Sequence, residues 1–230
     1  MDTRAISYVL IAIMAAAWII GGILKRATFG RLRRLLAAGD FDGFEALVSS
    51  RLARLLYPPY NLSYMRLNAS LMQDDFAAAD KQFQEMLSRR LGRAQRTDLV
   101  LKAFNFYLAR EKKARSEELL EEIQGWGDRY DAVKRECRQM HEIVNLNSSS
   151  YIEEMEGELA DVQGAKRGRL EYLLALQYGN KGDMSRRDEY LKRAESDSFA
   201  PKAEAGEKAD DRDAGDAVGP KETAARNRMR

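Results

Sequence analysis

The sequence is poor in the residues that build crosslinked or metal-stabilised folds. It contains one cysteine (Cys137), one histidine (His141) and four prolines among 230 residues. A single cysteine excludes a disulfide framework within the chain, and one cysteine with one histidine is too few for a Cys/His zinc module. Stability and function are therefore expected to come from packing and from surfaces.

Motifs that carry catalytic chemistry are also missing. The chain has no glycine-rich phosphate loop, no HExxH pair and no GxSxG nucleophile elbow. Cys137 and His141 lie four residues apart on a presumed helix and so share a face, but no third ligating or orienting group accompanies them. We therefore expect no enzyme activity, no catalytic residue, no metal site and no cofactor.

Charge is absent from one long stretch near the N-terminus. Residues 5–24 are uncharged and mostly apolar, and twenty residues of helix span about 30 Å, the thickness of a bilayer core. This stretch predicts a transmembrane signal anchor at Ala5–Leu24. The alternative is a signal peptide cleaved near Ala15–Ala17, which leaves only a short apolar run before the cleavage site.

Five basic residues follow the predicted span before the first acidic one: Lys25, Arg26, Arg31, Arg33 and Arg34. Before the span, Asp2 and Arg4 cancel. The excess of basic residues after the span predicts that residues 1–4 form a short extracytoplasmic N-terminus and that the rest of the protein is cytoplasmic. We expect a single-pass cell-membrane protein whose membrane-proximal basic residues contact anionic lipid headgroups.

The net charge of +2 hides two opposed halves. Side chains from residue 25 to residue 115 sum to +9, and those from residue 116 to residue 230 sum to −7. Opposite charges on two halves would suit head-to-tail association into a homo-oligomer. Nucleic acid is not an expected partner, because the basic clusters at 89–96 and 110–115 lack interleaved aromatic residues for base stacking.

After the span, amphipathic helical patterns alternate with short breaks that recur. Similar segments start at Ala37, Met72 and Ala109, which are 35 and 37 residues apart, and a fourth lies around Asp183. Each combines a turn or N-cap residue with the start of a second helix. Recurrence at this distance is typical of a repeat of helix pairs rather than of a simple bundle.

Two segments carry the best-defined pattern. One has Leu174, Ala175 and Tyr178, followed by Gly182, Asp183, Met184, Leu191 and Ala194; the other has Tyr64, Leu67, Asn68 and Leu71, followed by Asp75, Phe76, Ala79, Phe83 and Met86. On these residues the chain resembles the tetratricopeptide repeat (TPR) family, whose unit is two antiparallel helices in about 34 residues.

The other segments resemble the family less closely. A third unit has Ala103, Phe104 and Tyr107, followed by Leu119, Leu120 and Ile123, and an abbreviated first unit covers 32–56, before Pro58 and Pro59. Residues 128–162 predict two helices divided at 146–150, with little of the repeat pattern. Arg187, Ser116 and Phe44 stand where the family prefers a small residue.

The resemblance implies a TPR-like α-solenoid of four to five helical hairpins, residues 25–199. Together with the predicted span, this gives an all-α fold in which a single transmembrane helix precedes the solenoid. An irregular helical bundle with coincidental spacing is the alternative. Residues 200–230 have almost no large apolar side chain and equal numbers of acidic and basic residues. We expect them to form a disordered, charged tail.

In TPR proteins the first helix of each unit lines a concave groove that binds other polypeptides. The resemblance places ten residues of this chain on that groove: Leu62, Met65, Ala69, Met72, Leu101, Asn105, Leu108, Arg169, Tyr172 and Leu176. Such a wall is mostly apolar and suits an amphipathic helix or an extended hydrophobic peptide.

The sequence therefore predicts a membrane-tethered adaptor or scaffold that mediates protein–protein interaction at the cytoplasmic face. The expected partners are another protein, whose identity the sequence does not give, and the membrane itself. The alternatives are a self-assembling structural membrane protein and an import- or secretion-type receptor.

Overall fold

The computed structural model describes residues 3–198, apart from the side chains of residues 3–13, 16, 17, 197 and 198. Every regular element in this range is a helix, so the expected all-α class is confirmed for it. The helices fall into two compact units, residues 3–92 and 93–198. The predicted charged tail, 200–230, lies outside the described residues.

The first unit contains α1 (Thr3–Ala37), α2 (Phe41–Val48), α3 (Arg51–Leu56), α4 (Pro59–Met72) and α5 (Phe76–Leu87). The second contains α6 (Arg93–Ala109), α7 (Lys113–Gln124), the short 3₁₀ helix η1 (Asp128–Tyr130), α8 (Asp131–Asn145), α9 (Ile152–Glu158), α10 (Ala165–Lys181) and α11 (Met184–Ser198).

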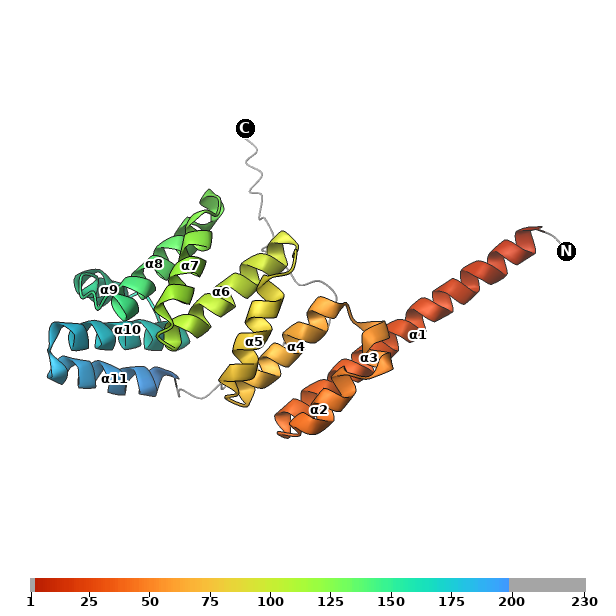
Figure 1. The fold of residues 1–230 in the computed structure, drawn as a ribbon, viewed down its shortest axis with the longest axis horizontal. Helices are drawn as coiled ribbons and strands as arrows, with labels where there is room; N and C mark the ends of the chain where they lie inside the picture. Colours follow the sequence, from red (N-terminus) through yellow and green to blue (C-terminus); the bar gives the residue numbers. More distant parts are fainter. Residues whose placement is uncertain (1–2, 199–230) are drawn as a thin grey trace, which may run out of the picture. The chain divides into compact units, whose positions relative to one another are not determined.

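Helix α1 runs without a break from the predicted membrane span into the first unit. Beyond Lys25 its side chains begin to pack, with Thr28 and Leu32 buried, and α2 and α3 lie alongside this C-terminal half (Figure 1). Gly30 has the lowest helix propensity of the residues in this half and does not interrupt it. No flexible linker therefore separates the two halves of α1.

The N-terminal half of α1 exposes its apolar side chains. We call the described part of it, residues 14–24, the apolar segment; its exposed large side chains are Met14, Trp18, Ile19, Ile20, Ile23 and Leu24. Where side chains are described, no helix is both long enough and apolar enough to cross a membrane. The predicted span Ala5–Leu24 falls partly on residues 5–13, 16 and 17, whose side chains lie outside the described part.

The core of the first unit joins four helices. Leu32 of α1, Phe44 and Val48 of α2, Ala53 of α3 and Leu62 and Ala69 of α4 form one buried cluster with Tyr57. Phe44 is larger than the residue the repeat pattern prefers, and it is almost fully buried here. In this first hairpin two short helices, α2 and α3, pack against α1 in place of one longer helix.

The hairpin turns of both units share one local geometry. A residue with positive φ ends a turn at Gly39, Asp74, Glu111, Asn147 and Gly182, so successive turns are 35, 37, 36 and 35 residues apart. In four of them the next residue donates its N–H to a carbonyl five residues earlier, as in Asp40 to Leu35 and Asp183 to Tyr178. This is the hydrogen bond of a Schellman-type helix end.

The predicted capping residues are confirmed at three of these turns. Asp40, Asp75 and Asp183 accept hydrogen bonds from the backbone N–H three residues ahead, at 2.8, 3.0 and 3.1 Å. The third recurring segment, which starts at Ala109, has its turn at Glu111, and α7 begins at Lys113. Ser116 is buried inside α7 and accepts a hydrogen bond from Asn145 of α8 at 2.8 Å.

Residues 128–162, which carry little of the repeat pattern, contain the same kind of turn. Its positive-φ residue is Asn147, and Ser148 donates to the carbonyl of Glu142, one residue further back than at the other turns. Asn180 of α10 holds this turn by donating to the carbonyls of Ile143 and Ser148, at 2.9 and 3.0 Å. The expected division at 146–150 is confirmed between α8 and α9.

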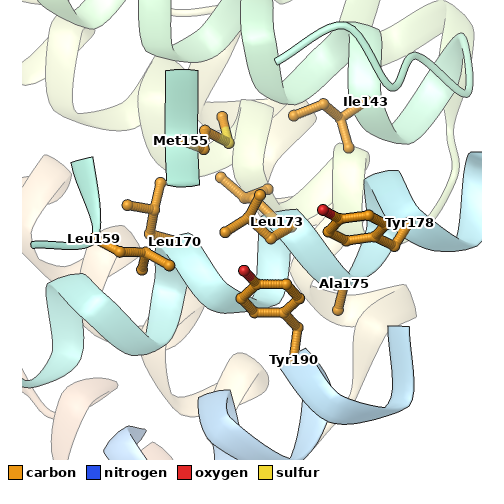
Figure 2. Close-up of a cluster of buried hydrophobic side chains, with 9 residues drawn as sticks. Ile143, Met155, Leu159, Leu170, Leu173, Ala175, Tyr178 and Tyr190 are labelled. Atoms are coloured by element: carbon orange, nitrogen blue, oxygen red, sulfur yellow. The ribbon is translucent and has the colours of Figure 1, made fainter. Parts of the chain in front are cut away.

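The core of the second unit lies where α8, α9, α10 and α11 meet. It contains Ile143, Met155, Leu159, Leu170, Leu173, Leu174, Ala175, Tyr178 and Tyr190 (Figure 2). The rings of Tyr178 and Tyr190 stack with centroids 5.5 Å apart. Both hydroxyls donate to one carboxylate oxygen of Glu156, at 2.7 and 2.9 Å, so α9 is tied to α10 and α11.

Replacing Glu156 with glutamine is expected to destabilise the second unit at neutral pH by about 1 kcal/mol. This is less than the ~1.5–3 kcal/mol of a hydrogen bond to a charged group, because the carboxylate is partly exposed. The Tyr178 hydrogen bond, with those of Tyr190 and the charge of Arg186, lowers the pKa of Glu156 below its ordinary value of 4.5.

A lowered pKa in the folded state means that the stabilisation is complete above the ordinary pKa and is lost as the pH falls. Urea titrations should therefore show a constant difference between wild type and Glu156→Gln from pH 6 to pH 8, and a shrinking one below about pH 4.5. Glu153→Gln, an exposed residue of the same helix, is the control. Equal stability of both variants at pH 7 would contradict the role of Glu156.

Candidate functional site

The groove residues predicted on α4 mostly face the core of the first unit. Leu62 and Ala69 are buried in it, and Met65 packs against it. Met72, at the end of α4, is exposed. Three of the four apolar side chains that the TPR resemblance places on a binding wall therefore contact α1, α2 and α3, and only Met72 is accessible.

The groove residues predicted on α6 divide in a similar way. Leu108 is buried and Leu101 is half-buried. Asn105 is exposed, and its amide donates to the carbonyl of Leu101 at 3.0 Å within the same helix. Because Asn105 is exposed, α6 contributes a polar side chain to the surface.

The residues predicted on α10 are the most accessible of the set. Tyr172 is 49% exposed, and Arg169 is exposed one turn earlier on the same face. Leu176 completes this row and is half-buried against the core of the second unit. The row is held in place because the opposite face of α10, from Leu170 to Tyr178, forms most of that core (Figure 2).

Helix α8 adds two residues that the sequence did not single out. Arg169 forms an ion pair with Glu136 at 2.6 Å and also contacts the sulfur of Met140 at 2.9 Å. We call this surface, formed by Glu136, Met140, Arg169 and Tyr172, the α8–α10 face. Glu136 and Met140 lie four residues apart, so a helix places them on one face. The weak repeat pattern of residues 128–162 did not show which face of this helix is exposed, and so the sequence did not identify them.

The α8–α10 face is chemically mixed. Arg169 and Glu136 are each about half exposed, at 49%, and satisfy one another, while the Tyr172 ring offers apolar area with a polar tip. The accessible surface thus differs from the mostly apolar wall that the resemblance implies. It suits a polypeptide that brings both an apolar side chain and charged or hydrogen-bonding groups.

The membrane-proximal basic residues lie on the C-terminal half of α1. Lys25 is half-buried, with its ammonium 5.8 Å from the centre of the Tyr57 ring. The remaining four are exposed and form no ion pair with any side chain that the structure describes: Arg26, Arg31, Arg33 and Arg34. Their charges are therefore available to an anionic surface.

Cys137 and His141 share a buried face of α8. Burial, with the nearby carboxylate of Glu136, raises the pKa of the Cys137 thiol to about 11, although the charge of Arg169 acts in the opposite direction. The thiol is therefore protonated at neutral pH, and a protonated thiol is a poor nucleophile. Within the described residues, no three His, Cys, Asp or Glu side chains are grouped as metal ligands would be.

Cys137 is expected to react slowly with iodoacetamide in the folded protein. A pKa of about 11 in place of 9.0 lowers the thiolate fraction at pH 7.5 about 100-fold, and burial slows the reaction further. The rate of this reaction should rise at least ~100-fold in concentrated urea, which unfolds the protein. Equal rates in folded and unfolded protein would show an accessible thiol whose pKa is not raised.

Comparison with protein-family models, with curated proteins and with solved structures finds no match for this chain. The TPR resemblance therefore stays a prediction from residues and spacing.

Proposed function

We propose that this protein is a single-pass membrane adaptor. The N-terminal half of α1 crosses the membrane, and a TPR-like α-solenoid that begins at Lys25 lies on the cytoplasmic side and binds another polypeptide through the α8–α10 face. Binding is non-covalent and uses no cofactor.

The observation that carries this proposal is the exposure of the apolar segment. Trp18 is 80% exposed, and its neighbours Ile19 and Ile20 are both more than half exposed. In water each such side chain costs about 25 cal/mol per Å² of apolar surface, whereas lipid removes this cost. The uncharged residues 5–13 extend the same run to bilayer length.

The recurring turns support the solenoid. Five of the six positive-φ residues of the described range, all except Gly164, lie in the turns inside the helix pairs. They recur at intervals of 35 to 37 residues, close to the length of the TPR unit. Within the second unit α8 packs against both α6 and α10, so the first helices of successive pairs are neighbours. This order is expected where paired helices stack.

The residue types on the α8–α10 face support a binding role. Tyrosine and arginine are enriched among the residues that dominate binding energy at protein interfaces. Tyr172 and Arg169 combine such side chains with a rigid helix as their support. The basic residues after the span and the uncharged span itself support the cytoplasmic orientation.

Tyr172→Asp is expected to lower capture of the partner about 30-fold, the effect of losing a dominant interface residue. Met184→Asp is the matched control, because Met184 is 48% exposed on α11 and lies outside the face. The full-length variants would be crosslinked in native membranes, purified, and the captured chains quantified by mass spectrometry. Equal capture by the two variants would contradict the assignment of this face.

Self-association is a second candidate, supported by the charges of +9 and −7 on the two halves. The crosslinking experiment separates self-association from binding of another protein, because a homo-oligomer yields only crosslinks between copies of this chain. Such crosslinks should weaken with added salt if the opposed charges hold the copies together.

A further inference from the structure

The short helix α3 carries the most exposed large apolar side chain of the described residues. Leu55 is 84% exposed, and Leu52, three residues earlier on the same face, is 41% exposed. Arg51 and Arg54 flank them and are exposed as well. The opposite side of α3 is fixed, since Ala53 is buried in the core of the first unit.

The C-terminal end of α3 lies beside the point on α1 at which the predicted span ends. The hydroxyl of Tyr57, the residue after α3, donates to the carbonyl of Lys25 at 2.6 Å. Lys25 is the first residue after the uncharged stretch. Helix α3 packs along α1 at this point (Figure 1), so its place relative to the end of the span is set by direct contacts.

This level corresponds to the lipid headgroups. The headgroup layer is about 5–7 Å thick on each side of the hydrocarbon core, and Leu55 precedes Tyr57 by only two residues, about 3 Å along a helix. The basic run Arg31–Arg34 starts about 10 Å beyond Leu24 along α1. By the same measure Arg51 lies about level with Arg31, whereas Arg54 lies nearer to the headgroups than Arg33 and Arg34 do.

We infer that α3 is a second membrane contact, in which Leu52 and Leu55 enter the boundary between headgroups and acyl chains and Arg51 and Arg54 bind anionic lipid headgroups. The inference rests on the proposed membrane span of α1. An apolar strip beside basic residues is the pattern of helices that lie in the interface. A span alone leaves the tilt of the first unit free, whereas a second contact fixes which side of the first unit faces the membrane.

The test uses the full-length protein with Cys137→Ser and one new cysteine at Leu55, Ile20 or Leu146, each labelled with the environment-sensitive dye NBD. The proteins are reconstituted in phosphatidylcholine vesicles with or without phosphatidylglycerol and with lipids that carry a spin-label quencher near the headgroup. Ile20 reports the span, and Leu146, 64% exposed between α8 and α9, reports water.

We expect the spin label to quench the dyes at positions 20 and 55 and to leave the dye at 146 unquenched. Arg51→Gln with Arg54→Gln should lower the ratio of docked to undocked α3 about 30-fold in vesicles with phosphatidylglycerol. Quenching at position 55 is then lost while quenching at position 20 is kept. Arg33→Gln with Arg34→Gln removes the same charge further from the headgroups and should preserve quenching at position 55.

The other outcomes overturn the inference in distinguishable ways. Quenching at 20 without quenching at 55 removes the α3 contact and leaves the proposed span intact. A dye at 55 that is shielded from water yet unquenched by lipid indicates a protein partner or a second copy on α3. Absence of quenching at 20 removes the span and the α3 contact together. Quenching at 55 that is independent of phosphatidylglycerol and of Arg51 and Arg54 contradicts headgroup binding by these arginines.

Discussion

Replacing Met14 and Ala15 with arginine is expected to release the full-length protein from the membrane. The two residues lie at the middle of the predicted span, where each arginine costs about 2.5–3.5 kcal/mol on insertion scales. Together they lower the inserted fraction about 10⁴-fold. Both side chains are exposed, so the substitutions remove no packing from the first unit.

The measurement is the division of the protein between the pellet and the supernatant after carbonate extraction of membranes. Ala37→Arg with Ala38→Arg is the control, since it adds the same charge at exposed positions beyond the span. The control should stay in the pellet, and the variant at 14 and 15 should move to the supernatant. Retention of both in the pellet would show that the apolar segment is not what holds the protein to the membrane.

Leu174→Ala is expected to destabilise the second unit by about 2–5 kcal/mol. Leu174 is fully buried on α10 among the side chains of the second core, so its truncation leaves a cavity between α10 and its neighbours. Tyr172→Ala, two residues away on the exposed side of the same helix, should change stability by no more than about 0.5 kcal/mol.

Urea unfolding followed by the fluorescence of Trp126 measures this difference, because Trp126 lies in the second unit and packs against Tyr130. Trp18→Phe removes the other tryptophan of the chain from the signal. Similar unfolding midpoints for the two variants would contradict the assignment of opposite faces of α10 to the core and to binding. Comparing Leu174→Ala with Tyr172→Ala also shows whether a loss of partner capture comes from unfolding of the second unit or from a change on its exposed face.

The helix pairs were predictable because their turns have local chemistry. Asp40, Asp75 and Asp183 cap the helices that follow them. The recurrence of similar segments from Ala37, Met72 and Ala109 gave the period. The turn at Asn147 was not predicted as part of the same series, because the aromatic and small residues of the repeat pattern are missing around it. Ser116, which stands where the TPR family prefers a small residue, is buried and accepts a hydrogen bond from Asn145, a contact that no local pattern encodes.

The accessible part of the groove was not predictable from the sequence. The TPR resemblance places Leu62 and Tyr172 on equivalent faces, yet Leu62 is buried in the core of the first unit while Tyr172 remains half exposed. Which of them is accessible depends on the helices that pack against each face. The pairing of Arg169 with Glu136 and the contact of Tyr57 with Lys25 join residues more than 30 positions apart, and no local pattern encodes them.

The central claim, that α1 crosses the membrane and the helical body lies on the cytoplasmic side, is tested most directly by labelling single cysteines with a membrane-impermeant maleimide. In the Cys137→Ser background, a cysteine at Leu146 should react only in inside-out vesicles, and one at Thr3 only in intact cells. Reaction of the Leu146 cysteine in intact cells, or reaction of both cysteines from the same side, would contradict the account.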